Sequence, residues 1–363
     1  MCVLSKNKYK NMFFLLFMLL PMLVFSGCTE KKQLHEKLMI QGIGVDFEND
    51  MYNITVQAKN FKNLAGEKEP TNTTLNIKEK SVSSAIDKIP ELTGLKPLVS
   101  QNLIIVIGEA AAKYGFNNFI DFFSRYHENR LNVNIRIAAG TAQDIFAVKI
   151  NDKPIESETL RSLANKKSDI NILKFQQDLK NKTTDPVLLV LRTNQEKTEI
   201  ICEEMAIISD DKLVAILDKN ETIGAQILRN VSELGSMSIN QNNKDNICTI
   251  DKVETKIITE IYPNIAIQSN ITVNALEFNK DPKYIESINE KIKENLPEKL
   301  TEICANVIKK TLDLKCDIFK FGKLFRNKYP NHFKTIQDDW KNHLQDIKYN
   351  IKININMNVI GTG

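Results

Sequence analysis

The sequence predicts an α+β protein, and three observations support this fold class. Segments that alternate apolar and polar residues, typical of half-buried strands, occur along the whole chain. Other segments space apolar residues three and four positions apart, as an amphipathic helix does. The two kinds of segment follow one another without regular alternation, which favours mixed or antiparallel sheets flanked by helices. We expect three domains after an N-terminal segment of residues 1–27.

The first expected domain spans residues 28–185 and begins with a short polar tether. We predict strands at 38–45, 52–58, 103–107 and 131–138, and helices at 81–92, 117–126 and 141–148. The first strand contains Gly42 and Gly44, which could suggest a dinucleotide-binding fingerprint. The third glycine is missing, however, and the strand leads into a hairpin instead of a helix. A nucleotide site is therefore not expected here.

The second expected domain spans residues 186–246. Strands at 205–208 and 213–217, joined by a turn at 209–212, predict a hairpin, and a helix follows over 221–229. The segment 235–246 is rich in Ser and Asn, which is typical of a boundary between domains.

The third expected domain spans residues 247–363, with strands predicted at 253–258 and 265–276. Asp281 and Pro282 suit a helix start, as N-cap and first helical residue. Pro297 is expected to kink or split this long helix, because proline lacks a backbone donor and clashes with the preceding turn. Strict alternation over 351–359 predicts a final strand with one apolar face.

The N-terminus has the features of an export signal. Three lysines precede an apolar run over 12–25, which is 14 residues long, whereas about 20 are needed to span a bilayer. Ser26 and Gly27 then place two small residues directly before Cys28. This pattern favours lipoprotein processing over an ordinary secretory signal: cleavage between Gly27 and Cys28, and a diacylglycerol on the Cys28 thiol, with or without a further N-acyl chain. Two acyl chains are enough for stable anchoring.

The composition excludes a general nucleic-acid surface. Without the three lysines of the signal, the chain has 46 basic and 45 acidic residues. This near balance also predicts that no polybasic patch assists the lipid. No apolar segment after Cys28 approaches the length of a membrane helix, so we expect a folded body on a lipid tether.

No catalytic or metal-ligating constellation stands out. His332 and His343 lie near paired aspartates, but their spacing fits no metal motif, and the chain has no HExxH, P-loop or Gly-x-Ser-x-Gly sequence. We therefore expect no catalytic residue, no metal and no cofactor besides the covalent lipid, which disfavours a cell-envelope hydrolase. Four further cysteines form no CxxC pair, and they suit either buried thiols or a disulfide: Cys202, Cys248, Cys304 and Cys316.

The segment 317–340 gathers many of the aromatic residues. Phe319, Phe321, Tyr329 and Trp340, the only tryptophan, are candidates for a partner surface, because aromatic residues are enriched at interfaces. The alternative is that they pack the long helix against the last sheet. Both interpretations are open at this stage.

The chain resembles the Ger(x)C lipoproteins, the C subunits of nutrient germinant receptors of spore-forming bacteria. The resemblance covers nearly the whole chain and rests on the order and spacing of short motifs. These are Cys28, Gly42-Ile43-Gly44-Val45-Asp46, Thr55-Val56-Gln57, Val106-Ile107-Gly108-Glu109, Phe119-Ile120-Asp121-Phe122-Phe123, Asp211-Lys212-Leu213-Val214-Ala215-Ile216-Leu217, Glu221-Thr222, Asp317-Ile318-Phe319-Lys320-Phe321-Gly322, Lys328-Tyr329-Pro330, Asp339-Trp340 and Ile360-Gly361-Thr362-Gly363.

The resemblance implies a non-enzymatic, lipid-anchored subunit with three α+β domains. It also implies a place on the outer face of the spore inner membrane, beside two integral membrane subunits called A and B, while the charge balance already argues against a nucleic-acid partner. A different class of protein, a solute-binding lipoprotein of a membrane transporter, is the alternative. That class predicts two similar lobes around a hinge and tight binding of a small solute.

Overall fold

A computed structural model describes residues 36–61, 71–125, 130–165, 168, 170–231, 234–241, 244–260, 262–275 and 282–357. Gly27, Cys28 and the rest of the predicted signal lie outside these residues, as does the C-terminal motif 360–363. The described chain is a mixture of sheets and helices, which confirms the α+β prediction. None of the described helices is both long and apolar enough to cross a membrane.

The first sheet is mixed, with nine strands among the described residues, in the order β11-β10-β9-β6-β5-β1-β2-β3 and with β4 beside β1. Neighbours run parallel from β1 through β5 and β6 to β9, and antiparallel toward both edges. The strands are β1 (Lys37–Glu48), β2 (Met51–Asn60), β3 (Thr71–Glu79), β4 (Lys96–Leu98), β5 (Ile104–Gly108), β6 (Asn134–Ala138), β9 (Val187–Thr193), β10 (Ile200–Ser209) and β11 (Lys212–Leu217). Every residue of β5 and β6 is buried, as expected for strands covered on both faces.

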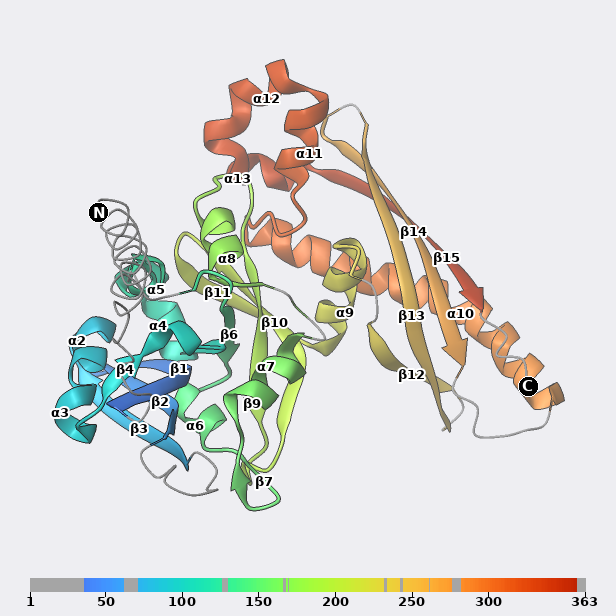
Figure 1. Ribbon diagram of the computed structural model, residues 1–363. Coiled ribbons are helices and arrows are strands. Elements are labelled where there is room, and N and C mark those ends of the chain that lie inside the picture. The colour runs from blue at the N-terminus through green and yellow to red at the C-terminus, as the bar shows by residue number, and fades with distance from the viewer. Residues whose placement is uncertain are drawn as a thin grey trace, which may run out of the picture.

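Helices cover both faces of the first sheet (Figure 1). One core contains residues of α2 (Val82–Asp87), α3 (Ile89–Thr93), α4 (Glu109–Tyr114), η3 (Phe116–Asn118), α5 (Ile120–Arg125) and α8 (Ile172–Leu179). The other contains residues of α6 (Ala142–Phe146) and α7 (Ser157–Asn165). The short elements η2 (Val99–Gln101), β7 (Lys149–Ile150) and β8 (Lys153–Pro154) complete this part of the chain.

A carboxylate fixes the start of α6 against the sheet. Asp46, near the end of β1, accepts hydrogen bonds from the backbone N–H groups of Ala142 (2.7 Å) and Gln143 (3.0 Å). Gly108 makes room for this carboxylate, because a Cβ at that position would lie 2.0 Å from Asp46 Oδ1. Burial raises the pKa of Asp46, although the two backbone hydrogen bonds oppose this shift. The motifs around residues 46 and 108 therefore meet at one point of the core.

The second sheet has the order β12-β13-β14-β15 and is covered by one long helix. Its strands are β12 (Gly235–Gln241), β13 (Lys244–Thr259), β14 (Asn264–Ala275) and β15 (Lys348–Met357), and the helix is α10 (Pro282–Asp313). Along β15 exposed residues alternate with half-buried or buried ones, which confirms the predicted final strand. It pairs in parallel with β14. Pro297 lies inside α10 without dividing it, so of the two predicted effects, a kink or a split, the split does not occur.

The sheets do not divide at the predicted domain boundaries. Strands β9 to β11, assigned to the segment 186–246, extend the first sheet through the pairing of β9 with β6. The helix α9 (Lys219–Leu228) contributes residues to the core of the second sheet. Strand β12 is an edge strand of that second sheet. The physical reason is that a hairpin and one helix cannot bury enough apolar surface to be stable alone.

A helical cap joins α10 to β15 and lies above the region between the two sheets (Figure 1). We use this name for residues 321–346. They form α11 (Phe321–Lys328), α12 (Pro330–Ile336), η4 (Gln337–Asp339), α13 (Trp340–His343) and η5 (Leu344–Asp346).

Candidate functional site at the junction of the two sheets

Two loops meet where the first sheet contacts the cap. Asp185 lies two residues before the start of β9, and Asp317 lies between α10 and α11. The Asp185 N–H donates to the Asp317 carbonyl (2.9 Å), and the Asp317 N–H donates to Asp185 Oδ2 (2.7 Å). Both aspartates are buried. Residues 132 positions apart are thus joined by two reciprocal hydrogen bonds.

The Asp317 carboxylate organises the start of the cap. Its Oδ1 accepts a hydrogen bond from the Phe321 N–H (2.9 Å), and its Oδ2 accepts from the Gly322 N–H (2.7 Å) and from Trp340 Nε1 (3.0 Å). Phe321 and Gly322 open α11, where backbone N–H groups have no partner within the helix. A carboxylate at this end also complements the helix dipole. One side chain therefore satisfies three buried donors.

Gly322 is required by the close approach of Trp340. A Cβ on Gly322 would lie 2.7 Å from Trp340 Nε1 and 2.9 Å from the Cβ of Thr183. This agrees with the expectation that a glycine here permits a tight backbone approach. The indole, only 1% exposed, is consequently held between the cap and the loop that leads to β9.

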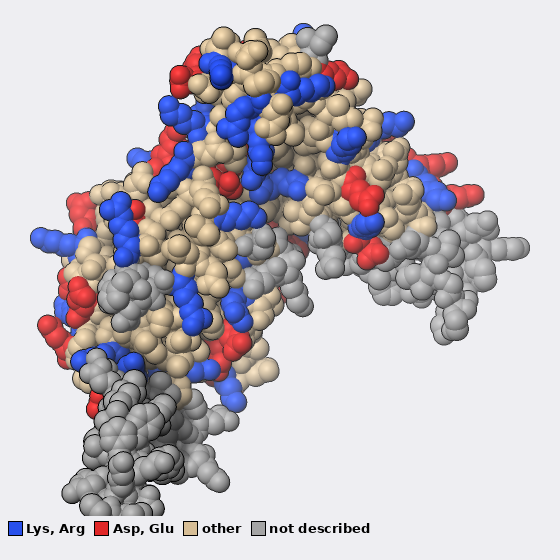
Figure 2. Space-filling model, turned by 45° about the horizontal axis from the view of Figure 1, so that its top comes forward, with Lys and Arg blue, Asp and Glu red and all other residues tan. Residues whose placement is uncertain are grey.

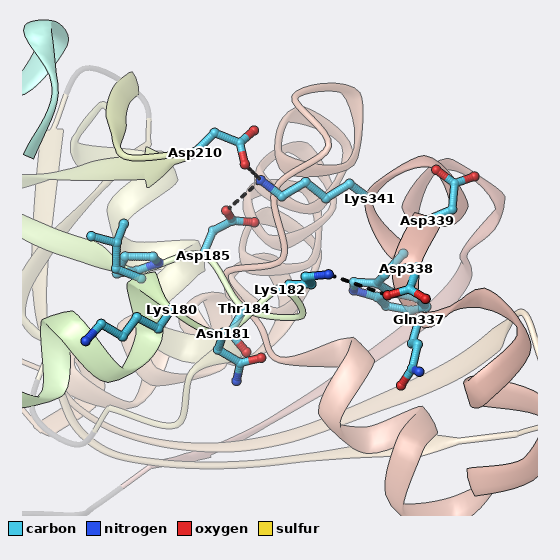
Figure 3. A pocket seen from close by; sticks show the side chains of 13 residues that line it. Lys180, Asn181, Lys182, Thr184, Asp185, Asp210, Gln337, Asp338, Asp339 and Lys341 are labelled. Atoms are coloured by element: carbon cyan, nitrogen blue, oxygen red, sulfur yellow. Dashed lines mark hydrogen bonds and ion pairs between the residues drawn. The ribbon is translucent and has the colours of Figure 1, made fainter. Parts of the chain in front are cut away.

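A lysine of the cap completes the junction. Lys341 Nζ lies 2.6 Å from Asp210 Oδ1, 2.7 Å from Ser209 Oγ and 3.4 Å from Asp185 Oδ1. Ser209 Oγ donates to the same Asp185 oxygen (2.7 Å). Figure 3 shows the Lys341 side chain reaching between the carboxylates of Asp185 and Asp210. Burial alone would lower the pKa of Lys341, but the hydrogen bond to Asp210 and the charges of Asp210 and Asp185 raise it.

Beside this network lies a polar pocket of about 280 Å³. The loop between α8 and β9, the turn after β10 and the η4–α13 segment line it with groups of both charges (Figure 3). Lys182 and Asp338 face each other at 3.5 Å, with side chains about four-fifths exposed, so this ion pair adds little stability. The lining contains no His, Cys or Ser, and no arrangement of a nucleophile beside a base. Its chemistry is that of hydrogen bonding and ion pairing.

Burial raises the pKa of Asp317 from its ordinary value of 3.8 to about 6, and the neighbouring Asp185 charge adds to this shift against three opposing hydrogen bonds. Between about pH 4 and pH 6 the folded chain therefore retains a proton that the unfolded chain has released. This contribution to stability is fully present below about pH 4 and is lost as the pH rises through about 6.

We expect the stability advantage of the native chain over Asp317→Asn to shrink as the pH is raised from about 4 to about 7, because only the native side chain titrates. Urea unfolding of both proteins across this range measures the difference. An advantage that grows with pH would show that the ionised carboxylate is the favoured form in the folded protein.

The structure corrects the proposed aromatic surface. Phe319, Phe321 and Trp340 are buried in the core of the second sheet, and Tyr329 is half-buried against it. The rings of Phe325 and Phe333 lie 6.0 Å and 5.2 Å from that of Trp340, measured between centroids. The short helices of the cap are amphipathic, so their apolar sides, which include Phe321, Phe325 and Phe333, pack into the core. The first three residues do not form a partner surface, and the core-packing interpretation holds.

The cysteines and histidines whose side chains the structure describes form no metal-binding cluster, and the described cysteines are buried. Cys202, Cys304 and Cys316 are buried thiols, and the side chain of Cys248 lies outside the description. Burial raises the pKa of Cys304 to about 12 and that of Cys316 to about 11, so neither is a reactive thiolate. Within the described part of the chain, no three His, Cys, Asp or Glu residues are placed to hold a metal ion.

Sequence reasoning singled out Asp317 and Trp340 but missed Asp185 and Lys341. The sequence did hold a usable sign of Asp185, because a charged residue there is followed by Pro186 and a buried apolar strand. Lys341 carried none, since a lysine after an aromatic residue is common on helix surfaces. Only the tertiary fold shows that these four residues belong together.

The fold and the junction define a two-sheet α+β protein in which a buried carboxylate network joins the first sheet to a helical cap. The chain belongs to the Ger(x)C family of spore germination proteins. Residues 30–193 match the family described as spore germination protein N-terminal domain, and residues 203–363 match the family described as spore germination B3/GerAC like, C-terminal.

Relatives and a solved structure agree with this assignment. Spore germination protein KC of Bacillus subtilis (strain 168) is 23% identical over 382 residues, covering 92% of each chain. The putative spore germination protein YfkR of the same organism is 23% identical over 230 residues, covering 58% of this chain and 60% of its own. The crystal structure of the GerBC protein is similar in fold, with a TM-score of 0.53 and 17% identity, covering 87% of this chain and 96% of that one.

Proposed function

We propose that this chain is a lipid-anchored, non-enzymatic subunit of a nutrient germinant receptor. It is attached through Cys28 to the outer face of the spore inner membrane and acts by contact with two integral membrane subunits, A and B. The observation that carries the proposal is the position of the family match. The match begins at residue 30, directly after the Ser26-Gly27-Cys28 processing pattern, and continues to the C-terminus with a short gap.

The junction supports a role that depends on shape. A subunit that acts by contact with other subunits needs its sheets and cap in a constant arrangement. Buried polar networks in which every group has a hydrogen-bond partner provide this rigidity. The pocket beside the junction offers charged and amide groups but no catalytic arrangement among its lining residues. Both features suit a protein that binds other molecules without transforming them.

The alternative of a solute-binding lipoprotein expects two similar lobes. Within the described residues, the two sheets differ in strand number and order, one with nine strands and the other with four. Nothing in the described part of the chain favours this alternative over the receptor subunit.

Cys28→Ala is expected to move the protein from the membrane fraction of spores to the soluble fraction, because the acyl chains supply the proposed attachment. Immunoblotting of separated fractions measures this. Cys2→Ala is the matched control, since that thiol leaves with the signal, and it should stay in the membrane fraction. Retention of the Cys28 variant would contradict the anchor. Normal germination with every nutrient, in spores lacking this chain and all paralogues, would contradict the receptor role.

A further inference from the structure

The cap carries an uninterrupted group of basic residues. Between Phe321 and Ile336 the sequence has four basic residues and no acidic one, and these are Lys323, Arg326, Lys328 and Lys334. The buried side of α11 includes Phe321, Gly322 and Phe325, which leaves Lys323 and Arg326 exposed three positions apart. Lys334 is exposed on α12. We call Lys323, Arg326 and Lys334 the basic face.

The basic face has no acidic counterpart. Among the described residues, none of its three side chains forms an ion pair, whereas some cations elsewhere on the surface do, such as Lys113 with Glu109. Lys328 is left out of the group because its ammonium donates to the Thr259 carbonyl. Figure 2 shows Lys and Arg side chains gathered over the cap, with few acidic ones among them. The acidic residues of the cap, Asp338, Asp339 and Asp346, all lie in η4 and η5.

This local excess is hidden in the total composition. The cap, residues 321–346, has five basic and three acidic residues, which leaves 41 basic and 42 acidic residues in the rest of the mature chain. The near-neutral total therefore conceals a local excess of positive charge on the cap. The expectation that no polybasic patch assists the lipid came from this total, which does not show how the charge is distributed over the surface.

We propose that the basic face binds the anionic headgroup surface of a lipid bilayer. A protein partner fits this surface poorly, because interface centres are rich in aromatic residues and depleted of lysine. Here the phenylalanines and the tryptophan of the cap are buried and Tyr329 is half-buried, and the exposed large hydrophobic residues of the described chain all lie outside 321–346. A surface of exposed cations without an apolar centre suits a diffuse layer of negative charge. The choice of a membrane rests on the proposed function, which places the chain at a bilayer.

The expected strength is modest and depends on salt. Each Lys or Arg near an anionic membrane strengthens partition by about fivefold. Three such residues alone would bind weakly, so they would orient a chain that a lipid already holds at the membrane. The attraction falls off within a Debye length, roughly 10 Å at 0.1 M salt.

The test uses the mature chain, residues 28–363, with Cys28→Ala so that no anchor contributes. Sedimentation with phosphatidylcholine vesicles, with and without phosphatidylglycerol, measures partition. The basic-face variant is Lys323→Glu, Arg326→Glu and Lys334→Glu. The matched control changes three exposed lysines far from the cap in sequence, which lie in β4, β7 and β8, to Glu: Lys96, Lys149 and Lys153. It changes the net charge by the same amount. Unchanged fluorescence of Trp340 shows that each variant is folded.

We expect binding that requires phosphatidylglycerol and weakens with added salt, and a loss of at least about tenfold in the basic-face variant with a much smaller loss in the control. Equal losses in both variants, or no dependence on phosphatidylglycerol, would overturn the proposal. A germination defect of the basic-face variant without any vesicle binding would also overturn it, and would indicate an acidic protein partner instead. None of these outcomes depends on Cys28, so they are independent of the test of the anchor.

Discussion

Replacing Asp317 by alanine is expected to lower the free energy of unfolding by about 3–5 kcal/mol, because each buried donor left without a partner costs about 1–3 kcal/mol. The carboxylate accepts hydrogen bonds from the N–H groups of Phe321, Gly322 and the Trp340 indole. The contacts with Asp185 are made partly by the Asp317 backbone, so they are weakened less directly. Urea unfolding followed by circular dichroism measures the loss.

The only tryptophan reports on the same site. Trp340 is buried, so unfolding exposes it to water and shifts its emission to longer wavelength. In Asp317→Ala this shift should occur at a lower urea concentration than in the native protein. Asp338→Ala is the matched control, since it removes a carboxylate from the same region whose side chain is 83% exposed. We expect the control to change stability by less than about 0.5 kcal/mol. Equal effects of the two substitutions would show that the buried network does not stabilise the junction.

Gly108→Ala is expected to destabilise the protein by about 2–4 kcal/mol, through overpacking and the loss of charge-assisted hydrogen bonds. The added methyl group would lie 2.0 Å from Asp46 Oδ1, which cannot move without releasing the N–H groups of Ala142 and Gln143. The start of α6 should then lose protection from hydrogen exchange. Thermal or urea unfolding measures the total effect.

A double-mutant cycle separates this clash from a general effect of the added methyl group. Asp46→Ala alone removes the helix anchor, and in that background the methyl group of Gly108→Ala meets no carboxylate. We therefore expect the second substitution to cost much less there than in the native chain, because residues in direct contact are not additive. Additive effects of Gly108→Ala and Asp46→Ala would rule out the contact as the cause.

Both predictions concern positions where short motifs that are far apart in the sequence come into contact in the folded protein. Asp46 and Gly108 join the first sheet to α6, and Asp317 joins the cap to the loop before β9. In each case a buried carboxylate satisfies helix N–H groups while a glycine makes room for it or its partner. Such motifs can be short because one carboxylate and one glycine are enough to fix how a helix packs against its neighbours.

Several elements could be predicted from the sequence because their signals are local. The final strand follows from alternation, since successive side chains of a strand point to opposite faces. The hairpin of β10 and β11 follows from two apolar runs around a polar turn. The long helix α10 follows from apolar spacing on both sides of Pro297. Each of these depends on residues close together in the chain.

What only the tertiary structure decided depends on residues far apart. The pairing of β6 with β9 unites two predicted domains in one sheet, and hydrogen bonds between residues 132 positions apart connect Asp185 to Asp317 and Ser209 to Lys341. The sequence by itself determined the α+β class, most strands and helices, and the family motifs. It could not show that Trp340 is buried or that Lys323, Arg326 and Lys334 form no ion pair among the described residues. Both are properties of packing, because a side chain is buried or left unpaired only by elements that the rest of the chain brings to it.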